Sequence, residues 1–213
     1  MPCDKGRGRI VNVKSHWEGV YTQRSVNEVG WYKPDFDISM SLIAEASRDR
    51  SARVIDIGGG ASLLVDSLLG RGYERIAVLD IAAPALEVAK RRIGDKAASV
   101  QWIVADIRDT PELGTFDVWH DRAVFHFLVD AADRQKYASL ARKTIPVGGH
   151  AIIATFSPTG PQKCSGLDTC RYSSDALAAE LGEGFELVKE VPEIHTTPSG
   201  KSQAFSYALL RRV

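Results

Sequence analysis

An aspartate and a run of glycines follow one another where an apolar stretch ends. The stretch Arg53–Ile57 contains Asp56 and runs directly into Gly58, Gly59 and Gly60. Glycine lets a backbone turn tightly and approach a ligand without a Cβ in the way. A carboxylate at this place can accept a hydrogen bond from a cationic amino group. The pattern therefore indicates a ligand with a cationic group above the glycines.

Two further aspartates end the next two apolar stretches. Asp80 stands twenty residues after Gly60, a position suited to accepting both hydroxyl groups of a ribose. Ile81 beside it is placed to press on an adenine face. Asp106 and Ile107 follow the third stretch, where a carboxylate can take the adenine amino group. All three acids fall at the carboxyl ends of expected parallel strands, which is where open α/β sheets bind ligands.

The elements that position these acids alternate between short apolar runs and helical patterns. This alternation predicts βαβ units and a parallel, doubly wound sheet. Strands are expected at Arg53–Ile57, Arg75–Asp80, Val100–Val104, Phe116–His120 and Gly149–Phe156. Helices are expected at Ile38–Ala46, Ala61–Leu69, Ala83–Ile93, Ala132–Thr144 and from Ser173 or Ser174 through Leu181.

The end of the chain departs from this rhythm. No helix separates the strand-like runs Phe185–Val191 and Ala204–Leu210, so they are predicted to pair antiparallel. A parallel sheet that ends in an antiparallel strand is not typical of a dinucleotide-binding domain. Leu63 also stands where the third glycine of the dinucleotide fingerprint belongs. A methyl donor is therefore favoured over a nicotinamide or flavin cofactor.

The length of 213 residues, without a linker rich in Pro, Gly or Ser, predicts a single domain over residues 1–213. Residues 1–50 lack the alternation of strand and helix patterns that the rest of the chain shows. Trp17, Tyr21, Trp31 and Tyr32 crowd into sixteen positions there, so this part is expected to form a cap over the cofactor and the substrate.

Composition excludes several classes of partner. Lys and Arg total 27, as do Asp and Glu, so net charge gives no reason to expect nucleic acid or an anionic membrane. No apolar run approaches the roughly 20 residues that span a bilayer, and no apolar segment follows the basic start to make a secretion signal. An odd count of three cysteines suits a reducing compartment. We expect a cytoplasmic protein, free thiols at Cys164 and Cys170, and no metal site.

The motif Asp56-x-Gly58-x-Gly60, together with Asp80 and Asp106, resembles the class I S-adenosylmethionine-dependent methyltransferases over roughly residues 35 to 213. The resemblance implies a Rossmann-like sheet of seven strands, mostly parallel with an antiparallel final strand. It also implies S-adenosyl-L-methionine as cofactor and S-adenosyl-L-homocysteine as product. The residues that it assigns to the cofactor are Trp17, Tyr21, Trp31, Asp56, Gly58, Gly59, Gly60, Asp80, Ile81, Asp106, Ile107 and Asp121.

Two branches of this class look close. The stretch Phe116-Asp117-x-Trp119-x-Asp121-Arg122-Ala123 is similar to thiopurine S-methyltransferases and their bacterial relatives. Those enzymes bring the arginine after the aspartate to the substrate, which implies a substrate-side role for Arg122. His16-Trp17-x-x-Val20-Tyr21 and Glu183-Gly184-Phe185-Glu186-Leu187 resemble relatives that methylate lysines of translation elongation factors.

The sequence favours a small-molecule acceptor of the thiol, selenide or amine type. Enzymes of the lysine branch usually carry a lysine where this chain has Arg122, and they lack a counterpart of the segment 157–171. The segment 157–172 is long enough to cover an acceptor pocket. A protein lysine is the alternative acceptor. An inactive binding module is a further alternative, against which the intact glycines and acids argue.

Methyl transfer asks little of side chains beyond alignment of the two reactants. A thiolate or a selenide needs no base, whereas an amine or a hydroxyl usually does. His120, His126 and His195 are candidates because imidazole titrates near neutral pH, although a histidine is more often structural. Arg122 and His126 are the expected catalytic residues on the substrate side.

We predict that the chain binds S-adenosylmethionine or S-adenosylhomocysteine in the micromolar range and that Asp80→Ala weakens this binding. The substitution removes the carboxylate that is expected to accept the ribose hydroxyls. Titration calorimetry measures both affinities, with NAD as the comparison ligand. Equal binding of NAD, or no binding of either adenosyl compound, would contradict the prediction.

Overall fold

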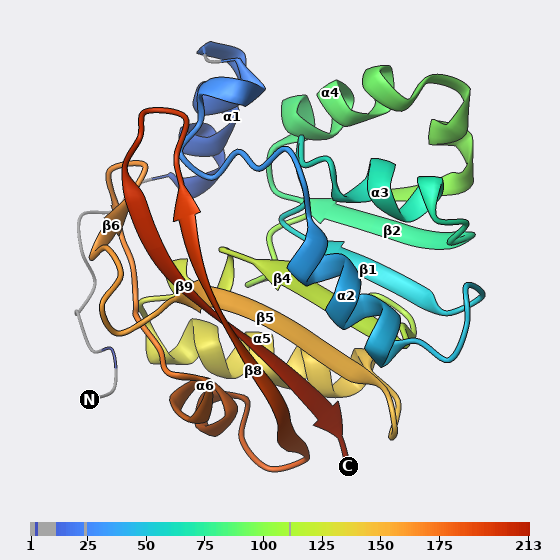
Figure 1. The fold of residues 1–213 in the computed structure, drawn as a ribbon, viewed down its shortest axis with the longest axis vertical. Coiled ribbons are helices and arrows are strands. Elements are labelled where there is room, and N and C mark those ends of the chain that lie inside the picture. The colour runs from blue at the N-terminus through green and yellow to red at the C-terminus, as the bar shows by residue number, and fades with distance from the viewer. Residues whose placement is uncertain (1–2, 4–11, 24, 111) are drawn as a thin grey trace.

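The computed structural model describes residues 3, 12–23, 25–110 and 112–213. The strands of its main sheet are β1 (Arg53–Ile57), β2 (Arg75–Asp80), β3 (Val100–Val104), β4 (Val118–Arg122), β5 (His150–Phe156), β8 (Phe185–Thr196) and β9 (Ser202–Arg212). Their order is β3-β2-β1-β4-β5-β9-β8 (Figure 1). The first five run parallel, whereas β9 is antiparallel to both β5 and β8. This confirms the predicted fold class.

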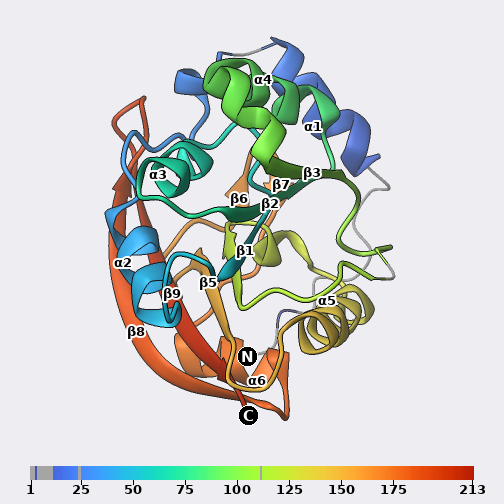
Figure 2. The same ribbon diagram turned by 90° about the vertical axis from the view of Figure 1, so that its right-hand side faces the viewer.

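Helices cover both faces of the sheet (Figure 2). On one face lie α2 (Asp37–Ala46), α3 (Leu64–Gly70) and α4 (Ala83–Ile93), and on the other α5 (Ala131–Thr144) and α6 (Ser174–Leu181). Because both faces are covered, β1 and β2 are almost entirely buried, which explains their continuous apolar runs. No helix in the described part of the chain is long and apolar enough to cross a membrane.

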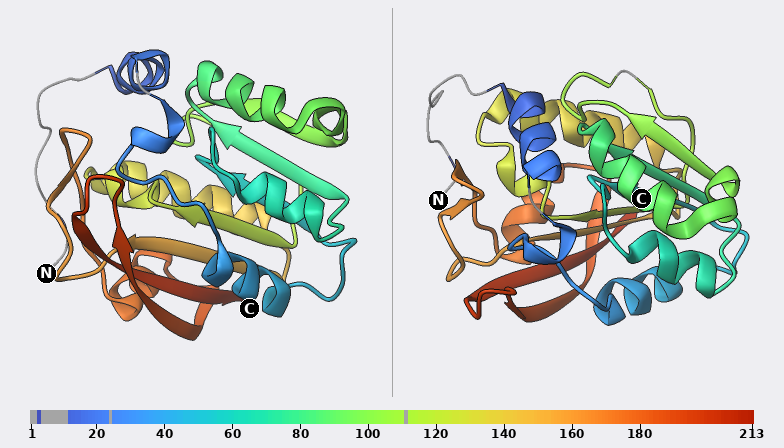
Figure 3. Two further views of the ribbon diagram at one scale, coloured as in Figure 1. Left: turned by 45° about the horizontal axis from the view of Figure 1, so that its top comes forward. Right: turned by 90° about the horizontal axis from the view of Figure 1, so that it is seen from above.

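Two elements lie outside these layers, near the carboxyl ends of the parallel strands (Figure 3). One is α1 (Val13–Gln23), none of whose residues is buried. The other is a two-stranded hairpin of β6 (Lys163–Cys164) and β7 (Leu167–Asp168), which lies within the segment expected to cover a pocket. A hydrogen bond of 3.3 Å between His16 Nε2 and Ser165 Oγ joins α1 to this hairpin.

Among the element boundaries that differ from the prediction, two do so for reasons that are local in the chain. The helix α3 begins at Leu64 rather than Ala61, because the Leu64 N–H donates to Ser62 Oγ at 3.1 Å and residues 61–63 complete the turn after the glycines. The strand β4 begins two residues later than predicted. Asp117, which was expected inside it, accepts the backbone N–H of Arg53 at 2.8 Å and so fixes the start of β1 instead.

The cysteines correct an expectation. Cys3 and Cys170 form a disulfide with their Cα atoms 5.5 Å apart, and Cys164 is free. The prediction that Cys170 is a free thiol is therefore wrong. The bonded residues are separated by 167 positions, so their contact depends on the fold and not on local spacing. The buried Cys170 also donates its N–H to His126 O at 2.7 Å, which ties it to the loop after β4.

A buried polar chain joins β4 to α5. Trp119 donates its indole N–H to Tyr137 Oη at 2.8 Å, and Tyr137 donates its hydroxyl to Asp121 Oδ2 at 2.7 Å. All three side chains are fully buried. Each polar group thus has a partner, which matters because an unpaired buried polar group destabilises the folded state.

Tyr137→Phe is expected to lower the free energy of unfolding by about 2 kcal/mol, because the Trp119 N–H loses its acceptor and Asp121 loses a donor. Urea denaturation measures the change. Tyr172→Phe is the matched control, since the buried Tyr172 hydroxyl has no partner among the described residues. Its effect should stay within about 0.5 kcal/mol. Equal losses in both variants would show that the polar chain does not stabilise the fold.

Candidate active site

A cavity of about 770 Å³ lies at the carboxyl ends of β1, β2, β3 and β4. Its floor comes from the residues that end these strands. Its walls come from α1, the loop 127–130 and the β6–β7 hairpin. Most residues that were expected to contact the cofactor line this cavity, namely Trp17, Tyr21, Trp31, Gly58, Asp80, Ile81, Asp106 and Ile107. The structure thus brings the glycine turn after β1, the ends of β2 and β3, and aromatic residues from the first 50 positions into one space.

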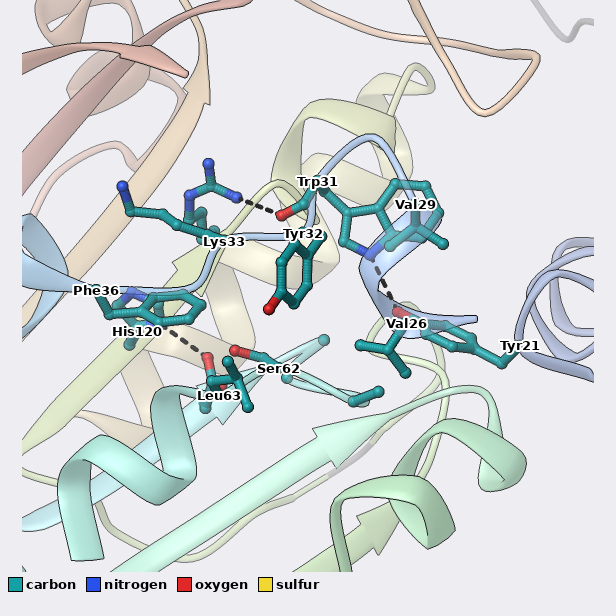
Figure 4. A pocket seen from close by; sticks show the side chains of 15 residues that line it. Tyr21, Val26, Val29, Trp31, Tyr32, Lys33, Phe36, Ser62, Leu63 and His120 are labelled. Carbon is teal, nitrogen blue, oxygen red and sulfur yellow. Dashed lines mark hydrogen bonds and ion pairs between the residues drawn. The ribbon is translucent and has the colours of Figure 1, made fainter. Parts of the chain in front are cut away.

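A smaller pocket of about 50 Å³ adjoins the cavity and shares Tyr21, Trp31, Gly58 and Arg122 with it. Asp56 and Gly59 lie in this pocket rather than in the larger cavity. Its opposite wall is the segment 26–36, from which Val29, Tyr32 and Lys33 are visible in Figure 4. Gly60 lines neither the cavity nor the pocket, but it lies next to Asp80 Oδ2.

The glycine turn requires the absence of side chains. Gly58 and Gly60 have φ angles of +66° and +44°, in the left-handed region that favours glycine. A Cβ on Gly58 would collide with the Val124 side chain, and one on Gly60 would lie 2.8 Å from Asp80 Oδ2. The turn can therefore approach both the loop after β4 and the acid at the end of β2 only because these positions carry no side chain.

Asp80 is a buried carboxyl with one oxygen committed to the backbone. Its Oδ1 accepts the Ala82 N–H at 2.7 Å, while Oδ2 faces Gly60. Burial raises the pKa of Asp80 to about 7, and the nearby charge of Asp56 adds to this rise. The carboxyl that was predicted to accept ribose hydroxyls therefore changes its ionisation near neutral pH.

Asp106 is held by an arginine that sequence reasoning overlooked. Arg108 donates from Nε to Asp106 Oδ1 at 2.9 Å, and its backbone N–H donates to the same oxygen at 2.9 Å. Burial raises the pKa of Asp106, but this ion pair outweighs burial, so its pKa lies below the ordinary value. Asp106 lines the cavity as an ionised, oriented group. Its contact with an adenine amino group stays a prediction.

Three aromatic residues of the expected cap, Trp17, Tyr21 and Trp31, form one connected cluster in the lining of the cavity. Trp17 meets the Trp31 ring edge-on with centroids 5.3 Å apart, and it meets the Phe127 ring at 5.2 Å. The Trp31 indole N–H donates to Tyr21 Oη at 3.2 Å (Figure 4). Although α1 has no buried residue, these ring contacts, its packing against α4 and the His16–Ser165 hydrogen bond attach it to the rest of the fold. Residues 1–2, 4–11 and 24 of the expected cap lie outside the described residues.

Asp121, which was expected on the cofactor side, lines neither space. Its carboxylate accepts the N–H groups of Val124 at 2.8 Å and Phe125 at 3.1 Å in addition to the Tyr137 hydroxyl. Burial raises the pKa of Asp121 to about 6 in spite of these donors. The expectation is corrected because the side chain points into the core, where it shapes the loop after β4.

Arg122 lies in the wall that the two spaces share, but its guanidinium is already engaged. Nε donates to Tyr207 Oη at 3.0 Å, Nη1 to the Trp31 carbonyl at 3.3 Å and Nη2 to Glu193 Oε2 at 3.4 Å. Lys33 pairs with the other Glu193 oxygen at 2.7 Å. Burial raises the pKa of Glu193, but Arg122 and Lys33 outweigh it, so the pKa is lowered. Arg122 therefore joins the cap to β8 and β9, and its approach to a substrate stays a prediction.

His126 is not brought to the site. The residue is fully buried and lines neither space. Its ring lies between aromatic neighbours, with the Phe127 and Phe156 centroids each 4.5 Å away. Burial lowers the pKa of His126 to about 3, and the charge of Arg122 lowers it further. A ring that stays neutral and out of contact with the cavity has no access to an acceptor, so His126 is not retained as a catalytic residue.

Sequence reasoning also missed how His120 is used. It was considered as a base, yet its ring is buried between Asp56 and Ser39, at 2.7 Å and 2.9 Å from them. Glu193 and Lys33 were missed entirely. They stand 160 positions apart in the chain, so no local sequence pattern predicts their ion pair.

Comparisons with known proteins agree with this geometry. A family model described as a methyltransferase domain matches residues 54–149. The EEF1A lysine methyltransferase 2 of Danio rerio is 25% identical over 195 residues, which cover 85% of this chain and 78% of that protein. A solved structure from work on the conversion of a disulfide bond into a thioacetal group during echinomycin biosynthesis is 20% identical, with a TM-score of 0.73 over 94% of this chain and 92% of that one. The N-methyltransferase NodS from Bradyrhizobium japonicum WM9, in complex with S-adenosyl-l-homocysteine, is 16% identical, with a TM-score of 0.64 over 83% and 86%.

The raised pKa of Asp80 predicts that the affinity for S-adenosylhomocysteine falls as the pH is lowered through about 7. Above this pH the carboxylate is ionised and accepts ribose hydroxyls, whereas below it the added proton removes acceptor capacity. The binding constant should decrease by up to about tenfold for each pH unit below the pKa. Calorimetry between about pH 8.5 and about pH 5.5 measures this dependence. Asp80→Asn should bind weakly and lose the step near neutral pH, and an unchanged step in that variant would assign the titration to another group.

Proposed function

We propose that the chain is a class I S-adenosylmethionine-dependent methyltransferase, in keeping with the methyltransferase domain matched at residues 54–149, and that it methylates a small-molecule nucleophile, with a thiol or a selenide favoured over an amine. The observation that carries this proposal is the cavity of about 770 Å³, whose lining combines the cofactor motif with apolar side chains from α1, the loop after β4 and the β6–β7 hairpin. These side chains are Trp17, Phe127, Leu128 and Leu167. A small acceptor would reach the same space as the cofactor.

The residues present fit the cofactor. Asp80 provides a carboxylate beside a turn whose glycines leave room for a close ligand, and Asp56 provides a second one in the adjoining pocket. Ile81 and Ile107 give apolar contacts for an adenine ring. The aromatic rings of the cap attract a cationic group through their faces. We assign the ribose to Asp80, the amino group to Asp56 and the adenine to the two isoleucines.

The cofactor contributes an electrophilic methyl group, so the protein's task is to align the acceptor and to exclude water. Val124 and Phe127 follow β4 and line the cavity beside Gly58, which makes them the proposed contacts of the reacting acceptor. The β6–β7 hairpin covers this end and is joined to α1 through His16 and Ser165. A cover made by two elements that contact each other favours a small acceptor over an extended polypeptide.

The lining favours a nucleophile that needs no base. Within the described residues, no histidine lines the larger cavity. Apart from Asp80, which is assigned to the ribose, the carboxylates there are engaged elsewhere: Asp106 and Asp133 with Arg108, Asp168 with Lys163, and Asp130 with the start of α5. A thiolate or a selenide reacts without proton removal in the transition state, whereas an amine usually needs it. The echinomycin-related neighbour, whose chemistry concerns sulfur, also supports this choice.

A protein lysine is the second candidate acceptor. The Danio rerio relative carries this activity in its name and aligns over most of both chains. Its identity of 25% supports the shared cofactor site more than a shared acceptor. The contribution of α1 and the β6–β7 hairpin to the cavity lining is the observation that favours the small molecule over this alternative.

With radiolabelled S-adenosylmethionine, we expect label to enter small thiols or selenide and not protein bands of a cell lysate. Turnover of a thiol should rise with pH as the thiolate fraction increases, because the thiolate is the nucleophile. Thin-layer chromatography and gel autoradiography separate the two kinds of product. Asp80→Ala is the control that should abolish either one. Label in a protein band of the size of an elongation factor, with none in thiols, selenide or amines, would favour the lysine acceptor instead.

A further inference from the structure

Asp56 and His120 face each other across neighbouring strands. β1 and β4 are parallel, and their register pairs Asp56 with His120, so the two side chains lie on the same face of the sheet. Both are buried, with exposed fractions of 4% and 1%. His120 Nδ1 lies 2.7 Å from Asp56 Oδ1, as the dashed line beside His120 shows (Figure 4).

Both nitrogens of the His120 ring have partners, so its orientation is defined. A carboxylate only accepts, so Nδ1–H is the donor to Asp56. In the neutral ring, Nε2 then accepts the hydroxyl of Ser39, whose Oγ lies 2.9 Å away. Ser39 is fully buried on α2. A rotation of the ring would break both hydrogen bonds at once.

The bond to His120 leaves the other oxygen of Asp56 for the small pocket. Oδ2 points toward Gly59, where a Cβ would collide with it. Among the described residues, Oδ2 has no hydrogen-bond donor of its own, and Asp56 lines the pocket. Without the His120 bond, no side-chain hydrogen bond among the described residues would hold the buried carboxylate toward the pocket.

Ser39 connects this pair to the cap. The segment 26–36 forms the opposite wall of the same pocket and leads directly into α2, which begins at Asp37. The bond between Ser39 and His120 therefore fixes the end of that wall relative to the acid across from it. The three residues link α2, β4 and β1 through two hydrogen bonds.

We propose that His120 is a positioning residue for the amino-acid end of the cofactor: it holds the Asp56 carboxylate toward the pocket and anchors it to α2 through Ser39. This inference rests on the proposed function, in which Asp56 accepts the cofactor's amino group. It assigns to His120 a role in binding rather than in proton transfer, since the ring lines only the smaller pocket and both of its nitrogens are engaged by Asp56 and Ser39.

The test uses two variants that each keep one half of the contact. In His120→Asn, the amide nitrogen stands where ring Nδ1 does and can still donate to Asp56. In His120→Gln, the amide reaches the position of Nε2, so the contact with Ser39 is kept and that with Asp56 is lost. The probes are S-adenosylhomocysteine, which carries the amino acid, and 5′-methylthioadenosine, which shares its adenosine half and lacks the amino group.

His120→Gln should raise the dissociation constant of S-adenosylhomocysteine by about tenfold, the loss expected for one hydrogen bond to a charged group. The same variant should leave the affinity for 5′-methylthioadenosine unchanged, and His120→Asn should restore most of the binding of S-adenosylhomocysteine. Calorimetry on the full chain measures all of these affinities, and urea denaturation shows whether the two variants are equally stable.

Three other outcomes would contradict either the inference or the proposed function. If the Gln variant loses affinity for both ligands equally, or for neither, His120 has a structural role and the inference is wrong. If Asn and Gln behave alike toward S-adenosylhomocysteine, the bond to Asp56 is not what matters. Failure of the unsubstituted chain to bind S-adenosylhomocysteine would instead overturn the proposed function, and the inference with it.

Discussion

The site depends on the close approach of two loops, one after β1 and the other after β4. Gly58 has no Cβ, and the Val124 side chain occupies the space that a Cβ would need. The second loop cannot move away, because Asp121 accepts the backbone N–H groups of Val124 and Phe125. Ala123, which lies between Asp121 and Val124 in the chain, adopts a φ of +74°, which is unfavourable for a residue with a side chain. The loop after β4 is therefore held in a strained form by a buried carboxylate.

This constraint explains why a chain of buried hydrogen bonds lies behind the cavity. Asp121 is hydrogen-bonded to Tyr137 on α5, and Trp119 donates to the same hydroxyl. These groups are removed from solvent, so each needs a partner to offset its lost hydration. The hydrogen bonds between these groups fix β4 against α5. The apolar side chains of the loop after β4 then face the cavity.

The cap is held by a different kind of interaction. Glu193 on β8 accepts from Arg122 and Lys33, while Arg122 also reaches the carbonyl of Trp31. The Arg122 and Lys33 cations share the buried Glu193 carboxylate. This arrangement keeps β8 and β9 in contact with the segment 26–36, which lines the smaller pocket. The antiparallel end of the fold thus has a direct part in closing the site.

The order of strands and helices and the place of the glycine turn could be read from the sequence, because each depends on local periodicity and on residues close in the chain. The same holds for Asp56, Asp80 and Asp106, since the ends of parallel strands must meet at one edge. The directions of Asp121, Arg122 and His126 could not be read in this way. Those of Arg122 and His126 follow from distant partners, Glu193 and Phe156, and that of Asp121 follows from the packing of Tyr137 on α5 against β4.

The sequence by itself therefore determined the fold class, the class of cofactor and the placement of Asp56, Asp80 and Asp106 at one edge of the sheet, because these depend on residues close in the chain. The tertiary structure decided which side chains reach the cavity and which are buried behind it. His120 shows the difference: its position at the end of a strand suggested a base, whereas its register opposite Asp56 makes it a buried partner of that acid. Register and burial arise from contacts across the whole chain, because a polar group removed from water must find whichever partner the packed core brings within hydrogen-bond distance.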